Sequence, residues 1–418
     1  MEPRRNLWKY ARGLERLRGY VSHMPSPTSN TETTRRFDAV TRAELARPDS
    51  RKWSLNEGTI GAWVAEMDFG TASNVRQAIL AAVEKDELGY LAPPTWARTA
   101  TAASAFFERR YDWAVEPERI HHIADVMGAF DVFVRHFTAP GSSIIVPTPA
   151  YMPFLVTDAL QGRETIEVAG VIEDERWTLD FDGIERAFAN GPANVVLVNP
   201  HNPTGTVYTR AELLRLADIV ERGGGRVFAD EIWAPLTLDG PQHIPYASIS
   251  AEAARHSVTS TAASKAWNVA GLKSAQIIFT NDADLEHYRT FGFGVVWGSS
   301  ILGAFAAEAA YSDSDGWLDE VNAALVENRD LLFRLVAELL PGVHAIVPES
   351  TYVAWLDVSA LGIDGSPAKF FLDNAGVTLT AGASCGADFE QYVRIVFATP
   401  KPVIEEIIQR MADALAAR

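Results

Sequence analysis

The chain has 418 residues, 47% hydrophobic and 22% charged, which is the composition of an ordinary globular protein. It contains no run of about eighteen apolar residues, so we expect no membrane span. Its formal net charge of −17 argues against a nucleic-acid groove, because a polyanion is repelled unless a local basic patch compensates.

Residues 1–36 differ from the rest of the chain. They hold an arginine-rich stretch followed by Pro25-Ser-Pro-Thr-Ser-Asn30, a composition typical of turns and disorder. A targeting peptide would need an apolar segment after the basic residues, and none follows. We therefore expect a disordered leader, or a start that belongs at Met24.

Cysteine and metal chemistry are not indicated. The single cysteine, Cys385, excludes an internal disulfide and fits a reducing compartment, so we expect a cytoplasmic protein. No histidine or aspartate pattern supports Cys385 as a nucleophile, and we interpret it as a buried or loop thiol. His121 and His122 lack metal-ligand spacing, and we expect no metal.

Helices and short apolar strands alternate from about residue 70. Apolar residues recur with helical period over 74–88 and 95–110. This alternation predicts an α/β fold with a mostly parallel sheet covered by helices on both faces. The predicted strands are 143–146, 195–198 and 227–229, and the predicted helices between them are 151–160 and 210–221.

A smaller α+β unit is predicted towards the C-terminus. A long helix over 317–340 ends at Pro341-Gly342. We expect a large domain of residues 70–310 and a small domain built from 37–69 with 311–418. The predicted elements that follow the long helix are strands 352–358, 376–380 and 392–397 and a closing helix over 402–417.

Three polar segments follow predicted strands directly. They are Thr148-Pro-Ala-Tyr151, Asn199-Pro-His-Asn202-Pro-Thr-Gly205 and Asp230-Glu231. Ligands of open α/β sheets collect at the carboxyl ends of the strands. The coincidence of these positions predicts a site there.

Lysine placement narrows the chemistry of this site. Only Lys265 and Lys273 lie in a small-residue loop downstream of the strand that ends in Asp230. A lysine held by small neighbours can bind a carbonyl cofactor as an imine. The pyridine nitrogen of pyridoxal phosphate (PLP) then needs a carboxylate, for which Asp230 is the candidate.

These segments resemble the fold-type I PLP enzymes of the aminotransferase class I/II superfamily. The resemblance covers about residues 37–418, and the Asn-Pro-Thr-Gly, Asp and Ser-Lys elements carry it. Trp63-Val-Ala-Glu-Met-Asp-Phe69 is similar to the branch of cystathionine β-lyases and cysteine-S-conjugate β-lyases, the MalY/PatB-like proteins. Further matches to this branch are Lys52-Trp53, Gly89-Tyr90, Thr148-Pro-Ala-Tyr151-Met-Pro-Phe154, Asn328-Arg-Asp-Leu331 and Tyr352-Val-Ala-Trp-Leu-Asp357.

The resemblance implies roles around the cofactor ring. Lys265 would hold PLP and, once released by substrate, take the Cα proton, which requires a neutral amine. Asp230 would keep the pyridine nitrogen protonated, and Asn202 would donate to the phenolic oxygen. Tyr151 would stack on the ring. The structural alternatives are that Lys265 is a surface lysine, Asp230 a helix N-cap, Asn202 a turn residue and Tyr151 a core aromatic.

The resemblance also implies phosphate and substrate contacts. Arg394 would bind the substrate α-carboxylate, with Trp63 and Tyr90 as further substrate-binding residues. Tyr90 would also reach the phosphate of a neighbouring subunit, which implies a homodimer with shared sites. The remaining phosphate ligands would be Ser264, Lys273 and the backbone N–H groups of Val126 and Met127 at a helix start.

Two positions depart from the family pattern. Ala262 replaces a serine that often binds the phosphate, and Trp233 stands where relatives have His or Tyr near the phenolic oxygen. An indole can donate a proton in a hydrogen bond but cannot accept one. Trp233 therefore joins the predicted cofactor-binding residues, in a reshaped pocket.

The predicted function is cleavage of an L-cysteine S-conjugate to a thiol, pyruvate and ammonia, with Lys265, Tyr151 and Arg394 as catalytic residues. An aminotransferase would use the same residues. A tailoring enzyme acting on a bulky S-cysteinyl intermediate of lincosamide type, and a PLP-binding regulatory partner, are further alternatives.

Overall fold

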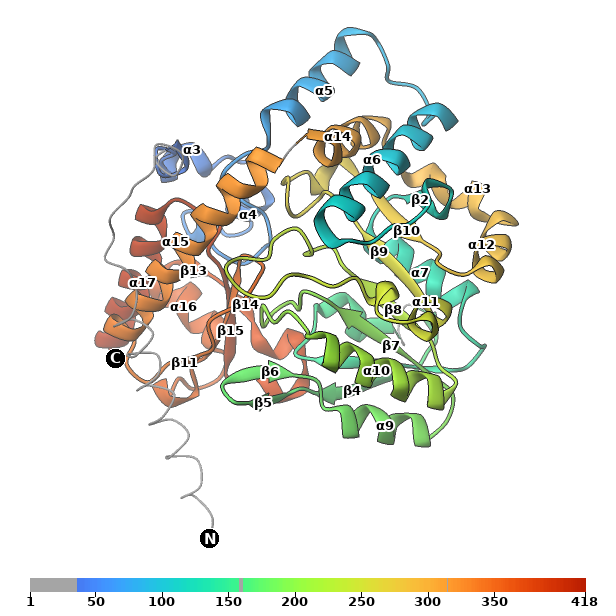
Figure 1. Cartoon of the computed structure of the whole chain (residues 1–418). Helices are drawn as coiled ribbons and strands as arrows, with labels where there is room; N and C mark the ends of the chain where they lie inside the picture. Colours follow the sequence, from blue (N-terminus) through green and yellow to red (C-terminus); the bar gives the residue numbers. More distant parts are fainter. Residues whose placement is uncertain (1–35, 158–160, 314) are drawn as a thin grey trace.

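The computed structural model describes residues 36–157, 161–313 and 315–418. The leader predicted for 1–36 therefore lies outside the described residues except for Arg36. Figure 1 shows a sheet flanked by helices, with the C-terminal elements gathered beside it together with the first described helices. Among the described residues no single helix has the length and hydropathy to cross a bilayer; one pair bent by 91°, Gly292–Gly298 with Ile301–Ser312, passes that test by length and composition.

The central sheet has seven strands in the order β2-β10-β9-β8-β7-β3-β4. Neighbouring strands run parallel except at β10, which is antiparallel to both β2 and β9. The predicted α/β fold with a mostly parallel sheet is confirmed. The strands are β2 (Ile120–Ile123), β3 (Ser143–Thr148), β4 (Thr165–Ala169), β7 (Ala193–Val198), β8 (Val227–Asp230), β9 (Ser257–Thr261) and β10 (Ala275–Ile278).

Both faces of this sheet are buried. Along β7, Val195 and Leu197 belong to one hydrophobic cluster, whereas Val196 and Val198 belong to another. Successive side chains of a strand point to opposite faces, so an apolar run satisfies both layers. The first cluster includes residues of α9 (Phe181–Ala189), α10 (Arg210–Gly223) and α11 (Ala251–His256), and the second those of α7 (Val126–His136) and α12 (Asp282–Arg289).

The second unit is built on a four-stranded antiparallel sheet in the order β11-β12-β15-β14. A separate parallel pair, β1 (Ile60–Gly61) with β13 (Val377–Thr378), joins the early chain to it. The division into two domains stays a prediction. The other elements of this second unit are β11 (His344–Ala345), β12 (Val353–Asp357), β14 (Thr380–Ala381), β15 (Tyr392–Val396), α15 (Asp315–Leu339), α16 (Pro367–Ala375) and α17 (Lys401–Ala416).

Two predicted elements differ from the structure. The strand expected over 376–380 is two short strands, because β13 pairs with β1 whereas β14 pairs with β15. The helix expected over 151–160 begins instead as a 3₁₀ helix, Met152–Val156, in which Phe154 N–H donates to the Tyr151 carbonyl at 3.0 Å. Residues 158–160 lie outside the described residues.

The remaining helices lie around these sheets. α14 packs against α5 and α6, which Figure 1 shows together at one end of the molecule. These helices and the shorter ones are α3 (Arg42–Leu45), α4 (Arg51–Ser54), α5 (Ser73–Glu84), α6 (Pro93–Tyr111), α13 (Gly292–Val295) and α14 (Ile301–Asp313).

Candidate active site

The sheet order brings the predicted polar segments together. Strands β9, β8, β7 and β3 are consecutive neighbours; the Lys265 loop follows β9, and the three predicted polar segments lie at the carboxyl ends of the other three strands. Lys265 follows β9, Asp230 ends β8, Asn202 follows β7 and Tyr151 follows β3. Parallel strands end at the same edge, so these four side chains share one edge of the sheet.

Lys265 is held against a backbone carbonyl. Its Nζ donates to the Ala65 oxygen at 2.9 Å and lies 5.6 Å from the centroid of the Trp233 ring. Burial, and secondly the charge of Arg394, lower the pKa of Lys265 to about 8. This amine therefore has a substantial neutral fraction near physiological pH, as a proton acceptor requires.

Asp230 is a buried carboxyl group, 5% exposed, at the end of β8. Its Oδ1 accepts a hydrogen bond from Ile232 N–H at 3.1 Å within a turn, and among the described residues no helix starts here, so the helix N-cap alternative is wrong. Burial raises the pKa of Asp230 to about 7, against the lowering effects of this hydrogen bond and of Lys265. A cationic partner would return this carboxyl to its ionised form.

Arg394 and Asn202 are in direct contact. Arg394 Nη1 donates to Asn202 Oδ1 at 3.0 Å, and Nη2 donates to the Trp63 carbonyl at 2.8 Å and to Thr380 Oγ1 at 3.2 Å. Arg394 is 4% exposed, and its Nε has no partner among the described residues. A buried guanidinium bonded to neutral groups is suited to an anionic ligand such as a carboxylate.

The predicted phosphate ligands meet at the start of α7. Lys273 Nζ contacts Asp125 Oδ2 at 2.7 Å, and Asp125 caps the helix by accepting from Gly128 N–H at 2.8 Å. Lys273 thus lies beside the helix start that Val126 and Met127 form. Asp125 places a carboxylate beside these predicted phosphate ligands, a feature that the sequence analysis did not consider. Ser264 is half-buried in the loop after β9.

The other predicted residues are less uniformly placed. Tyr151 is half-buried, and burial raises its pKa while Arg394 lowers it and Asp230 raises it further, so its phenol lies within the field of both. Trp233 is 2% exposed. The Trp63 indole donates to the Lys52 carbonyl at 3.2 Å, so its backbone, rather than its ring, contacts Arg394. Tyr90 is fully exposed and does not contact this cluster within one subunit.

Comparisons with known proteins agree with this geometry. The family model of aminotransferase class I and II matches residues 64–411. The cystathionine beta-lyase of Corynebacterium glutamicum is 38% identical over 89% of this chain and 98% of its own length. The chain belongs to the aminotransferase class I and II family.

Two further relatives place this family member in the β-lyase branch. Cystathionine beta-lyase PatB of Bacillus subtilis is 30% identical over 90% of this chain and 99% of its own length. The PLP-bound C-S lyase from Staphylococcus hominis is 28% identical, with a TM-score of 0.81 over 91% of this chain and 98% of that chain. The predicted superfamily and branch are confirmed.

The site of this class I and II family member fits PLP, the cofactor of the family. Asp230, buried with a raised pKa and one backbone hydrogen bond, suits a cationic pyridine nitrogen. Lys265, with its lowered pKa, suits capture of an aldehyde. Lys273 and the start of α7 supply donors for a phosphate. Among the described residues no group of three or more His, Cys, Asp or Glu side chains could hold a metal.

Sequence analysis matched segment 63–69 to the β-lyase branch but did not predict that its backbone carbonyls accept hydrogen bonds from Arg394 and Lys265. Besides the Trp63 and Ala65 carbonyls, the segment is joined to the Lys265 loop by Asn268, whose side chain accepts from Met67 N–H at 3.0 Å and donates to the Met67 carbonyl at 2.8 Å. The buried Lys52–Asp68 ion pair, at 2.7 Å, anchors the segment to the start of the described chain. Asn268 adopts a φ of 57°, which asparagine tolerates better than most residues.

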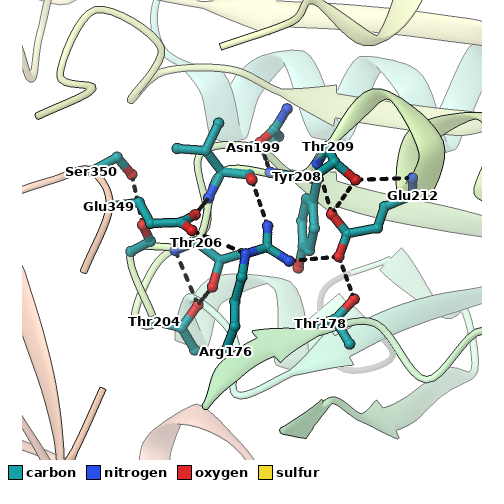
Figure 2. Close-up of polar contacts among 12 residues, drawn as sticks. Arg176, Thr178, Asn199, Thr204, Thr206, Tyr208, Thr209, Glu212, Glu349 and Ser350 are labelled. Atoms are coloured by element: carbon teal, nitrogen blue, oxygen red, sulfur yellow. Dashed lines mark hydrogen bonds and ion pairs between the residues drawn. The ribbon is translucent and has the colours of Figure 1, made fainter. Parts of the chain in front are cut away.

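A second missed feature supports the Asn202 loop (Figure 2). Glu349 Oε2 accepts from Val207 N–H at 2.8 Å, and its Oε1 accepts from Arg176 Nε at 3.0 Å. Arg176 also donates to the Val207 carbonyl at 2.6 Å. Ser350 Oγ donates to the Gly205 carbonyl at 3.0 Å. The loop that carries Asn202 is therefore held in place by Arg176, Glu349 and Ser350, none of which belongs to the central sheet.

Proposed function

We propose that this chain is a PLP-dependent lyase that cleaves the carbon–sulfur bond of an L-cysteine S-conjugate, either cystathionine-like or a bulkier thioether. The products are a thiol, pyruvate and ammonia. The observation that carries the proposal is a lysine with its pKa lowered to about 8 at the sheet edge where Asn202 contacts Arg394, a buried arginine of β15 whose hydrogen-bond partners among the described residues are all neutral. The names of the relatives support the reaction class.

Each residue has a distinct task. Arg394 binds the α-carboxylate of the substrate and so fixes its Cα near Lys265. The neutral amine of Lys265 takes the Cα proton, and the sulfur leaves with the electron pair of the C–S bond. When bound, PLP supplies an electron-accepting ring, and Asp230 keeps its nitrogen protonated. Water then converts the remaining three-carbon fragment to pyruvate and ammonia.

An assay of products separates this lyase from an aminotransferase. Purified enzyme with PLP is incubated with L-cystathionine and with a set of S-alkyl and S-aryl cysteines, and free thiol, pyruvate and pyridoxamine phosphate are measured. We expect thiol and pyruvate in equal amounts. Stoichiometric pyridoxamine phosphate without thiol would make the chain an aminotransferase. Lys265→Ala serves as the control that should form neither product.

We also propose that the enzyme is a homodimer with shared sites. Tyr90 is fully exposed in one subunit, and Phe293 and Trp297 are 74% and 76% exposed. Large apolar side chains that are this exposed are typical of protein–protein contacts. A second copy of the chain would cover these rings and bring Tyr90 to the phosphate of its neighbour.

A cytoplasmic location completes the proposal. It is supported by Cys385, a buried free thiol. Fractionation of the producing cells tests it, since we expect the lyase activity in the cytoplasmic fraction. Activity released with the secreted or cell-envelope fraction would contradict this location.

A further inference from the structure

The Ala65 carbonyl is shared by two donors. Lys265 Nζ and the Tyr352 hydroxyl each lie 2.9 Å from this oxygen. Tyr352 is fully buried, and this is its hydroxyl's one hydrogen bond among the described residues. Burial raises the pKa of Tyr352 far above neutrality, so its hydroxyl remains a donor. A carbonyl oxygen has two lone pairs, and here both are used.

The surroundings hold this arrangement in place. The Trp233 ring packs edge-on against Tyr352, with centroids 4.7 Å apart, and its centroid lies 5.6 Å from Lys265 Nζ. Three charged groups act on the Lys265 amine: Arg394 lowers its pKa, whereas Glu66 and Asp230 raise it. The Ala65 carbonyl is the hydrogen-bond acceptor of the amine, so its strength as an acceptor bears directly on the proton affinity of Lys265.

We propose that Tyr352 is a positioning residue which, by sharing the Ala65 carbonyl, keeps the Lys265 ε-amine in its neutral, proton-accepting form. Hydrogen bonding to a charged form stabilises that form. An oxygen already bonded to a phenol is a weaker acceptor for an ammonium group than the same oxygen alone. The inference rests on the proposed function only in that a neutral Lys265 serves as the base there.

Competitive acetylation of Lys265 in the cofactor-free, full-length chain tests this without substrate or turnover. The chain is treated with a trace of acetic anhydride between pH 6.5 and 9, and peptide mass spectrometry measures acetyl-Lys265. In Tyr352→Phe the carbonyl is left to Lys265 alone. We expect the pKa of Lys265 to rise by about half to one unit, so labelling at pH 7 falls about three- to tenfold.

Two further variants complete the experiment. Tyr311→Phe is the matched control, because it removes another buried hydroxyl, one that donates to Gln276 Oε1 at 2.7 Å and not to the Ala65 carbonyl. Labelling of Lys265 in this variant should equal that in wild type. Replacement of Tyr352 by 3-fluorotyrosine preserves the shape and strengthens the donor, so labelling at pH 7 should rise about twofold. This variant decides the question if Tyr352→Phe does not fold. Unchanged labelling in a folded Tyr352 variant would overturn the inference.

Tyr352→Phe should also change the pH dependence of the PLP-bound enzyme. The acidic limb of kcat should move to higher pH in Tyr352→Phe, with the rate recovered at high pH, whereas a merely structural loss would lower the rate at every pH. The two proposals can fail separately. Shifted labelling with no thiol product would contradict the lyase alone, and thiol production with unshifted labelling would contradict the role of Tyr352 alone.

Discussion

At Asp230, stability and function oppose each other. Burial raises its pKa to about 7 in the folded, cofactor-free chain, whereas an unfolded chain has a value near 3.9. Between these values the folded chain binds a proton that the unfolded chain has lost. The contribution of Asp230 to stability is therefore present below about pH 4 and is lost as the pH rises to about 7.

Asp230→Asn should remove this loss of folding stability with rising pH. We expect the cofactor-free variant to melt higher than wild type at pH 8 but close to it at pH 4.5, since each pK unit corresponds to about 1.4 kcal/mol. Lyase turnover should fall at least about a hundredfold, because an amide cannot hold the ring nitrogen protonated. Thermal unfolding at both pH values measures the first effect, with the exposed Asp218→Asn as control. A lower melting temperature at pH 8 would contradict the pKa argument.

We expect Asp125 to compete with the cofactor phosphate for Lys273. Its carboxylate pairs with Lys273 at 2.7 Å at the start of α7, where an anion is expected to bind. Asp125→Asn keeps an oxygen for Gly128 N–H but removes the negative charge. We expect the Kd for PLP to fall about three- to tenfold, as for a repulsion between partly exposed charges.

Absorbance titration of cofactor-free protein measures this affinity. The control is Asp131→Asn, an aspartate further along α7 that pairs with Arg135 at 2.7 Å. Its removal should leave the Kd for PLP unchanged. Weaker binding in Asp125→Asn would mean that Asp125 orients Lys273 rather than competing for it.

At the scale of elements, the Asn202 loop depends on a contact with the segment before β12. Glu349→Gln should weaken the pair with Arg176, whose side chains are 24% and 27% exposed respectively, and destabilise the fold by about 1–2 kcal/mol. A displaced Asn202 should also change the visible absorption of bound PLP. Glu338→Gln, at an exposed ion pair on α15, is the control that should do neither. Loss of stability with an unaltered spectrum would restrict Glu349 to a structural role.

The elements that the sequence predicted best are those whose pattern is local. Apolar runs such as 195–198 are strands because both sheet faces are buried, and the polar segments after them reach one edge. The split between β13 and β14 depends on which strand each one meets, which no local pattern encodes. The same holds at Ala65, where a backbone oxygen binds Lys265 and any residue type could supply it.

At the scale of the whole molecule, the family and the cofactor chemistry were predictable because spaced motifs carry them. The predicted role of Tyr90 depends on a second subunit, because its ring is fully exposed within one. If the sites are shared, a subunit's Lys265 works with the Tyr90 of its neighbour. This is a property of the assembly, so it requires a test on mixed subunits.

Two inactive variants should therefore restore each other. Lys265→Ala and Tyr90→Ala chains, each with little activity alone, are mixed in equal amounts under conditions that exchange subunits. Half of the dimers would be hybrids, and one site of each hybrid has both residues intact, so about a quarter of the wild-type activity should return. Sites contained within one subunit would give no gain over the average of the two parents. Mixing Lys265→Ala with Asp230→Asn is the control. Both residues belong to the same subunit's site, so neither site of a hybrid dimer would be intact and no activity should return. A gain in this control would mean that Asp230 also acts across the interface.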